Sequence, residues 1–228
     1  MLLLFDIDGT LLLKAFYAHR DALDAALTSV YGLHEHKAPQ ISAAGRTDLE
    51  IARAILLAND VSAERIDDRL DEFCAAAADE YARRCPADLS AHVAPGMAEL
   101  VASLAARDGV RLALVTGNLE PIAHLKLTRA GLGRFFAPGL GGFGSDDEDR
   151  AALPPIARRR AGSEGEPYPR NRTLVVGDTP RDIACAHADG LRCVAVATGP
   201  YGVDQLQDAD AVARDGRELA ELLELELV

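Results

Sequence analysis

Hydrophobic and polar positions along the chain alternate between two kinds of segment. Short apolar runs closed by glycine or polar residues predict buried strands at 110–115, 173–176, 192–197 and 211–213, and a weak one within 135–144. A further run starts at Leu2 and ends in Asp6 and Asp8. Between these runs, helical spacing with proline or glycine at the ends predicts helices over 96–104, 121–131, 146–161 and 180–190, and one at the C-terminus. This alternation predicts an α/β fold, a Rossmann-like parallel sheet covered by helices on both faces.

Residues 14–90 follow a different pattern, because their apolar positions recur only at helical spacing. A first helix is predicted up to Gly32, a loop over 33–45, a second helix after Thr47 and a third from Ser62 to Arg84. The sequence therefore predicts an all-α cap domain at 14–90, inserted into a core domain formed by 1–13 and 91–228. Its position directly after the first strand places it over the carboxyl edge of the sheet.

Composition narrows the class of protein. The 228 residues are 49% hydrophobic and 26% charged, which argues against disorder. The net charge of −12 argues against binding to nucleic acid or to an anionic membrane. The chain has no run of the ~18 apolar residues that a membrane span needs and no close pair among its four cysteines. We expect a soluble cytoplasmic protein with reduced thiols; the sequence predicts no oligomeric state.

Polar residues follow three of the predicted strands, at their carboxyl ends. Parallel α/β sheets carry their functional sites at this carboxyl edge. They are Asp6 with Asp8, Thr116 with Asn118, and Asp178. Two carboxylates on one face of a strand repel each other unless a cation or a shared proton offsets them. A helix-loop-helix calcium site is excluded, because the required glycine and glutamate are replaced by leucine and tyrosine.

The oxygen ligands at this edge suit Mg²⁺ and not zinc. They are the side chains of Asp6, Asp178 and Asp182, and the backbone carbonyl of Asp8. A carboxylate such as Asp6 can attack phosphorus to form an aspartyl-phosphate, while Asp8 serves as general acid and base. These residues predict phosphoryl transfer.

Further residues are candidates for holding the phosphoryl group. Thr116 and the backbone around Gly117 can donate hydrogen bonds to it, and Asn118 is the next residue along. Lys126 lies on an apolar helix face from which a long side chain leans back toward the strand edge. We expect it to supply the cation that phosphoryl transfer requires.

These motifs resemble the haloacid dehalogenase superfamily, and within it the phosphoglycolate phosphatase-like members with a helical cap. The resemblance rests on D-x-D-G-T at Asp6–Thr10, Thr116-Gly117-Asn118, and G-D-x-x-x-D at Gly177–Asp182. It implies that Asp6 is the nucleophile, Asp8 the acid and base, Thr116 a phosphate ligand and Asp178 a Mg²⁺ ligand, with Asp182 in or near the metal shell. The second aspartate implies phosphate chemistry, since the dehalogenases lack it.

Many relatives carry their basic active-site residue in a K-P-x-P segment before the last motif. This chain departs from that pattern, because it has no such segment. Lys126 occupies the position that other branches use, and Arg150 and Arg158 are possible substitutes. In the cap, Arg46 lies in a G-R-T-D stretch that resembles a loop which relatives lower toward the active site. Arg46 therefore either contacts a substrate carboxylate or second phosphate, or is a solvated residue at a helix start.

Several other features are expected to be structural. The run 139–144 fits G-x-G-x-x-G but follows no clean strand, so a glycine-rich strand and turn is favoured over a dinucleotide site. Arg158, Arg159 and Arg160 are expected at a solvated helix end. Lys14 and His19 open the first helix of the cap, where either could face the substrate, but a place on the surface is favoured for both.

The function predicted from the sequence is a Mg²⁺-dependent phosphatase of small phosphorylated metabolites. The alternatives are a phosphomutase similar to β-phosphoglucomutase, and a non-catalytic metabolite-binding protein on the same fold. The intact Asp6, Asp8 and Asp178 argue against the latter.

Overall fold

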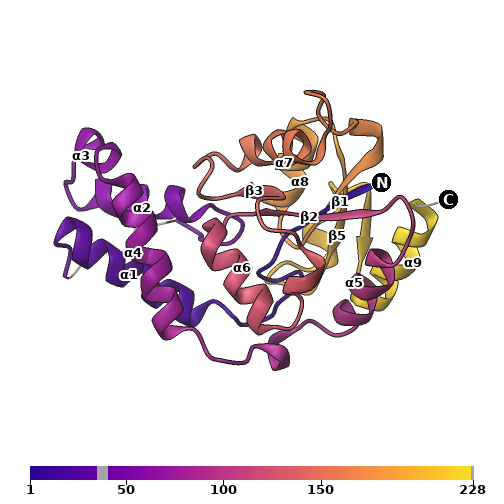
Figure 1. Ribbon diagram of the computed structural model, residues 1–228, viewed down its shortest axis with the longest axis horizontal. Helices are drawn as coiled ribbons and strands as arrows, with labels where there is room; N and C mark the ends of the chain where they lie inside the picture. Colours follow the sequence, from indigo (N-terminus) through magenta and orange to yellow (C-terminus); the bar gives the residue numbers. More distant parts are fainter. Residues whose placement is uncertain (35–40, 227–228) are drawn as a thin grey trace.

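The computed structural model describes residues 1–34 and 41–226 and contains one parallel sheet with helices on both faces (Figure 1). The strand order is β3-β2-β1-β4-β5-β6. The strands are β1 (Leu2–Phe5), β2 (Arg111–Thr116), β3 (Gly141–Phe143), β4 (Thr173–Gly177), β5 (Arg192–Val196) and β6 (Ala211–Ala213). The predicted fold class is confirmed.

The helices that pack against the sheet divide between its two faces because side chains alternate along each strand. Leu3 and Phe5 of β1 belong to the apolar cluster shared with α5 (Met97–Ala105), α6 (Glu120–Arg129) and α9 (Gly216–Glu226). Leu2 and Leu4 belong to the cluster on the opposite face, with α7 (Leu153–Ala161) and α8 (Pro180–Ala188). Both faces of β1 are therefore buried, which fixes the strand in the centre of the sheet.

The segment between β1 and α5 is helical and lies to one side of the sheet, at the left of Figure 1. It contains α1 (Tyr17–Tyr31), α2 (Asp48–Ala58), α3 (Ala63–Asp67) and α4 (Leu70–Arg84), which we call the helical segment. Its two connections to the sheet run side by side, since Leu13 N–H donates to His92 O (2.7 Å) and Ala94 N–H donates to Leu11 O (2.9 Å). The division into domains at 13/14 and 90/91 stays a prediction.

Two predicted helices differ from those observed. The single helix over 62–84 is broken at Asp68 and Arg69, where Arg69 leaves helical geometry (φ −121°, ψ 14°) and binds Glu72 and the carbonyl of Val30. The helix predicted from residue 146 begins only at Leu153, where the two prolines that follow suit a first turn. Residues 150–152 form a 3-10 turn instead. Part of the predicted loop 33–45 lies outside the described residues.

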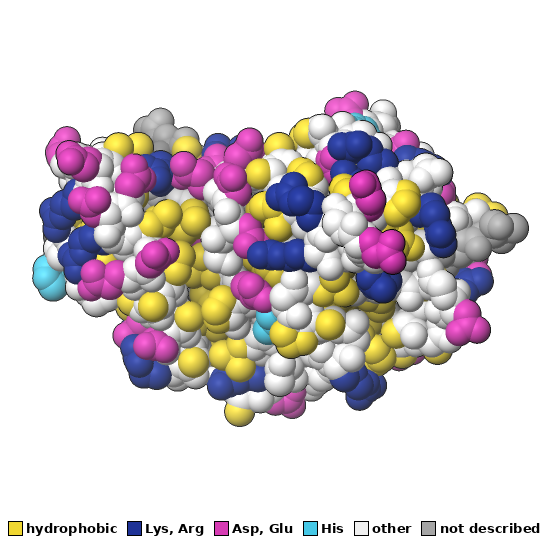
Figure 2. Space-filling view, turned by 45° about the horizontal axis from the view of Figure 1, so that its top comes forward, with side chains coloured by type: hydrophobic (Ala, Val, Ile, Leu, Met, Phe, Trp, Pro, Cys, Tyr) yellow, Lys and Arg dark blue, Asp and Glu magenta, His cyan; other side chains and the backbone are white. Residues whose placement is uncertain are grey.

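On the face shown in Figure 2, acidic and basic side chains are interspersed. No helix in the described ranges combines the length and the apolar character that a bilayer crossing demands. Among the described residues all four cysteines are free thiols, three of them buried, as the sequence predicts.

Candidate active site

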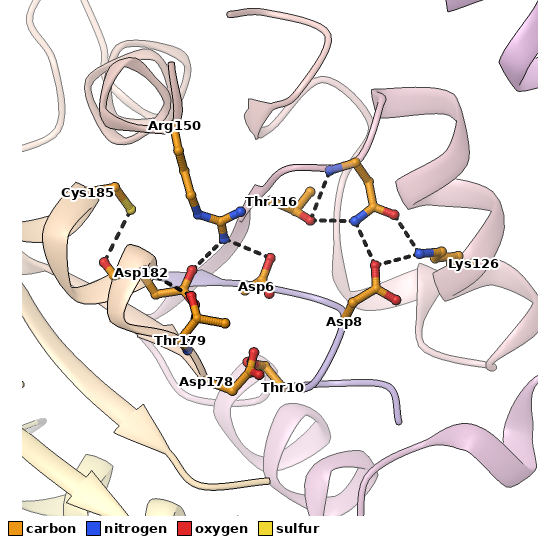
Figure 3. Close-up of polar contacts among 11 residues, drawn as sticks. Asp6, Asp8, Thr10, Thr116, Lys126, Arg150, Asp178, Thr179, Asp182 and Cys185 are labelled. Atoms are coloured by element: carbon orange, nitrogen blue, oxygen red, sulfur yellow. Dashed lines mark hydrogen bonds and ion pairs between the residues drawn. The ribbon is translucent and has the colours of Figure 1, made fainter. Parts of the chain in front are cut away.

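The candidate site lies at the carboxyl edge of the sheet, where β1, β2 and β4 end side by side (Figure 3). β1 ends at Phe5, so strand alternation does not extend to the aspartates. Instead the chain turns sharply after Asp6, with Leu11 N–H donating to Ile7 O (2.9 Å) and Gly9 N–H donating to Leu12 O (2.8 Å). This turn presents Asp6 and Asp8 to different neighbours.

Three buried carboxylates form an acidic cluster at the ends of β1 and β4. Asp6, Asp178 and Asp182 each place one oxygen within 4.8 Å of the others. Asp182 is fixed in the first turn of α8, where its Oδ2 accepts from the N–H and hydroxyl of Thr179 (2.9 and 2.7 Å). Asp178 is fixed by the hydroxyl of Thr10, which donates to its Oδ1 (3.0 Å). The sequence prediction that these three side chains meet is borne out by this geometry.

The surroundings of the cluster disfavour negative charge. Burial raises the pKa of Asp6 to about 6, although Arg150 opposes this. Burial and the neighbouring Asp182 and Asp6 raise the pKa of Asp178 to about 9. Among the described residues, Asp178 Oδ2 is buried without a hydrogen-bond partner. A buried carboxylate oxygen without a partner, next to two more carboxylates, fits a hard divalent cation bound by oxygen ligands.

Arg150 contacts the acidic cluster from the 3-10 turn before α7. Its Nη2 forms an ion pair with Asp6 Oδ1 (3.0 Å) and donates a short hydrogen bond to Asp182 Oδ1. The guanidinium side chain is 7% exposed, and its charge is balanced by these two carboxylates. From the sequence, Arg150 is only a possible substitute for Lys126. The Pro154-Pro155 pair was the signal that the helix starts late and leaves Arg150 in a turn at the sheet edge.

Lys126 does reach the strand edge, as predicted, but it binds Asp8 and not the acidic cluster. Its fully buried ammonium donates to Asp8 Oδ2 (2.5 Å) and Asn118 Oδ1 (2.6 Å), and lies 3.1 Å from His19 Nδ1. An ammonium has three protons and no acceptor. All three protons therefore have acceptors within the protein.

These contacts also define the protonation of His19. Because Lys126 can only donate, His19 Nδ1 accepts, so Nε2 carries the proton and donates to Asp48 Oδ2 (2.9 Å). The prediction that His19 lies on the surface is wrong, since the residue is 7% exposed. The sequence does not show that His19, on α1, lies against Lys126 of α6, so its burial could not be predicted.

Asp8 is held in the ionised form by this network. Burial alone would raise its pKa, but Lys126 and the hydrogen bond from Asn118 Nδ2 (2.8 Å) outweigh burial and lower it. Only Asp8 Oδ2 accepts the hydrogen bonds from Lys126 and Asn118, and Oδ1 has no hydrogen-bond partner within the described chain. Asp6 and Asp8, two positions apart, therefore have pKa values shifted in opposite directions.

Thr116 and Gly117 close the site on the side of β2. Thr116 Oγ1 accepts from Asn118 Nδ2 (2.9 Å) and the Asn118 N–H (3.4 Å), which leaves its own proton free to donate. At Gly117 an added Cβ would lie 2.1 Å from the backbone oxygen of Arg46, so only glycine fits. Gly117 O in turn accepts from the Asp48 N–H (2.8 Å).

The two remaining arginines that the sequence singled out are both paired. Arg46 donates through Nε to Ser42 O (2.9 Å) and forms a short ion pair with Glu50. Arg158 is buried and binds both oxygens of Asp189 (2.6 and 3.1 Å), away from the acidic cluster. The prediction of a solvated Arg158 is therefore wrong; its place on the inner face of α7 explains the difference.

Comparison with known proteins defines the class. The family model described as haloacid dehalogenase-like hydrolase matches residues 3–187. The chain therefore belongs to this family, and the predicted recognition and enzyme class are confirmed.

Individual relatives refine the comparison. The chain is 31% identical over 215 residues to a phosphoglycolate phosphatase of Rhodospirillum rubrum, covering 92% of this chain and 84% of the relative. It is 30% identical to phosphoglycolate phosphatase 1 of Pseudomonas aeruginosa, covering 87% and 70%. Similar solved structures include β-phosphoglucomutase from Clostridium difficile (TM-score 0.67, 15% identity, covering 98% and 95%). Another is CbbY from Rhodobacter sphaeroides with phosphate (0.61, 20%, covering 96% and 95%). At these identities the structures show a shared fold.

Proposed function

We propose that this protein is a Mg²⁺-dependent phosphatase that hydrolyses small phosphorylated metabolites through an aspartyl-phosphate on Asp6. The observation that carries the proposal is the contrast between Asp6 and Asp8. Asp6 faces Arg150 and the acidic cluster, while Asp8 faces Lys126 and Asn118. Two carboxyl groups with different surroundings are the arrangement that assigns separate nucleophile and acid/base roles.

In the first step, an Asp6 oxygen attacks phosphorus, and the bond from phosphorus to the ester oxygen breaks. Asp8 gives its proton to that leaving oxygen, so an alcohol departs. The free protein holds Asp8 ionised, and the negative charge of a bound phosphate ester favours its protonation.

In the second step, water attacks phosphorus and Asp8 accepts a proton from it. The bond between phosphorus and Asp6 breaks, which releases inorganic phosphate and restores the carboxylate. Arg150 offsets negative charge beside Asp6, and the free hydroxyl proton of Thr116 is available to a phosphoryl oxygen. The N–H groups around Gly117 and Asn118 are proposed as further donors.

Asp6, Asp178 and the carbonyl of Asp8 would hold the Mg²⁺ ion. Asp178 offers a buried oxygen without a partner among the described residues, whereas both oxygens of Asp182 already accept hydrogen bonds. We therefore place Asp182 in support of the ligands. When bound, the ion supplies positive charge that neutralises the phosphate and the cluster.

The proposal includes the helical cap at residues 14–90 as the part that selects the substrate. A phosphomutase remains the second candidate because the solved structures of this fold include β-phosphoglucomutases. The relatives of higher sequence identity are named as phosphatases, which favours hydrolysis.

The test is release of inorganic phosphate from phosphoglycolate, sugar phosphates, nucleotides and pyrophosphate, with Mg²⁺ and with EDTA. We expect Mg²⁺-dependent release by the wild type and none by Asp6→Asn, whose amide is not a nucleophile. Asp21→Asn, at an exposed aspartate of α1, serves as the control and keeps full activity. Residual turnover in Asp6→Asn contradicts the mechanism, and phosphate returned to sugar instead of water identifies a mutase.

A further inference from the structure

A cavity of about 860 Å³ opens from the catalytic aspartates into the space between the helical segment and the sheet. Its floor is polar and includes Asp6, Asp8 and Asp178. Its apolar lining includes Leu12, Leu13 and Phe16 from the connection after β1, Leu23 from α1, and Ile51 and Ile55 from α2. Phe16 is 45% exposed, so a large aromatic side chain faces the solvent here. The polar end of the cavity fits a phosphate, and the remainder is lined mainly by hydrocarbon.

The cavity is not a gap between separated parts of the chain, because the helical segment is already bound to the sheet edge. Asp48 N–H donates to Gly117 O, and Leu119 N–H donates to Asp48 Oδ2, both at 2.8 Å. Thr47 Oγ1 also donates to Glu148 O at 2.8 Å. With these contacts formed, the volume beside the aspartates remains.

The polar side chains of the helical segment at this cavity are largely occupied. His19 and Asp48 bind each other, and Arg46 is paired with Glu50. Two other basic residues of this part of the lining, Lys14 and Arg20, are exposed and remain available to a charged group. Apart from these two cations, the described walls of the helical segment offer a leaving group mainly hydrocarbon contact.

We propose that the alcohol part of the substrate is an apolar group of about six or more carbons, which is a refinement that rests on the phosphatase function proposed above. Ligand sites of about 300–1,000 Å³ take molecules of drug size. A two-carbon acid such as phosphoglycolate would leave most of this volume to water against apolar walls. Burying one methylene group strengthens binding about fourfold, so chain length is the direct measure of the fit.

The experiment compares binding of ethylphosphonate and hexylphosphonate to the Mg²⁺-loaded protein by calorimetry. The phosphonates are not hydrolysed, so the measurement does not depend on turnover. We expect hexylphosphonate to bind at least about tenfold more tightly. Equal affinity, or tighter binding of ethylphosphonate, overturns the inference.

Two substitutions on α2 localise the effect. Ile51→Ser removes apolar wall and should reduce the preference for the longer chain severalfold. Leu57→Ser alters an exposed residue (49%) outside the lining and should leave the preference unchanged. An unchanged preference in folded Ile51→Ser overturns the assignment to this cavity.

Hydrolysis of ethyl and hexyl phosphate separates the two proposals. Release of phosphate from both at equal efficiency supports the phosphatase and contradicts the apolar site. Tight hexylphosphonate binding without hydrolysis of any monoester supports the apolar site and contradicts the phosphatase.

Discussion

Arg150 and Asp6 form a buried ion pair in which Nη2 lies 3.0 Å from Oδ1, with each side chain 7% exposed. The same nitrogen also binds Asp182. Because an arginine stays charged at any working pH, this cation offsets Asp6 whether or not a metal ion is bound. It therefore supplies a fixed positive charge beside the carboxylate proposed to attack phosphorus.

We predict that Arg150→Gln lowers kcat/KM by about 10²-fold or more, the range found when one preorganised donor at a developing charge is removed. The assay is phosphate release at saturating Mg²⁺. Circular dichroism establishes the temperature at which the variant is folded.

Arg158→Gln is the matched control, because Arg158 lies in the same helix region and also forms a buried ion pair, with Asp189. Breaking such a pair costs about 3–5 kcal/mol of stability. Both variants should therefore melt at lower temperature, and only Arg150→Gln should lose activity in the folded state. Comparable activity loss in both would show that Arg150 matters only for stability.

The sequence was sufficient to predict the sheet and the meeting of the acidic residues. Short apolar runs and glycine or proline at helix ends depend only on nearby residues, and these define β1, β4 and the start of α8 at Pro180. Asp178 and Asp182 were placed together because both are tied to that strand and helix end.

The partners of the basic residues depended on contacts that no local pattern records. Arg150 lies in a turn beside Asp6 because one helix begins seven residues late, at Leu153 and not at Asp146. His19 lies more than 100 residues from Lys126 in sequence, and only the packing of α1 brings the two together. The buried pairing of Arg158 with Asp189 has the same origin.

Lys126→Met is predicted to raise the pKa of Asp8, because the ammonium that opposes the effect of burial is lost. In the proposed mechanism, transfer to Asp6 requires protonated Asp8, so we expect activity to fall as pH rises through the pKa of Asp8. The limb of the kcat profile that reports Asp8 in the substrate complex should move to higher pH by about one unit or more. Lys126→Arg keeps the charge and should move it less. A limb at the same pH in Lys126→Met would remove Lys126 from this role.

Removal of the metal is predicted to make stability depend on pH. The pKa of Asp178 is raised from 3.8 to about 9 in the folded metal-free protein. The folded state therefore holds this proton more tightly than the unfolded state, and stability falls as pH rises between these values. At the proposed site Mg²⁺ would take the place of the proton, and the penalty would then be removed.

The measurement is the melting temperature at pH 5, 7 and 9, with Mg²⁺ and with EDTA. We expect the difference between the two conditions to widen as pH rises. In Asp178→Asn the difference in melting temperature between Mg²⁺ and EDTA should be small at every pH. The Mg²⁺ concentration for half-maximal activity of this variant should rise at least about tenfold. A difference that is the same at all three pH values in the wild type contradicts the assignment.

Gly9→Ala is predicted to damage the metal site through Asp178. Gly9 has φ +95°, and an added Cβ would lie 2.2 Å from Asp178 Oδ2, the oxygen proposed as the open metal ligand. The methyl group must displace this carboxylate, because 2.2 Å is far below van der Waals contact. The Mg²⁺ concentration for half-maximal activity should rise at least about tenfold, as for loss of a group that orients a ligand.

Gly32→Ala separates this effect from backbone strain. Gly32 has φ +76°, and an added Cβ would meet nothing within 4 Å. A left-handed alanine should therefore lower the free energy of unfolding of both variants by about 1–2 kcal/mol. Unfolding in urea measures this change. Only Gly9→Ala should also change the Mg²⁺ requirement, because only its methyl group points at a proposed ligand. Equal Mg²⁺ requirements in the two variants would mean that the turn at Gly9 tolerates the methyl group and that Asp178 is not held against it.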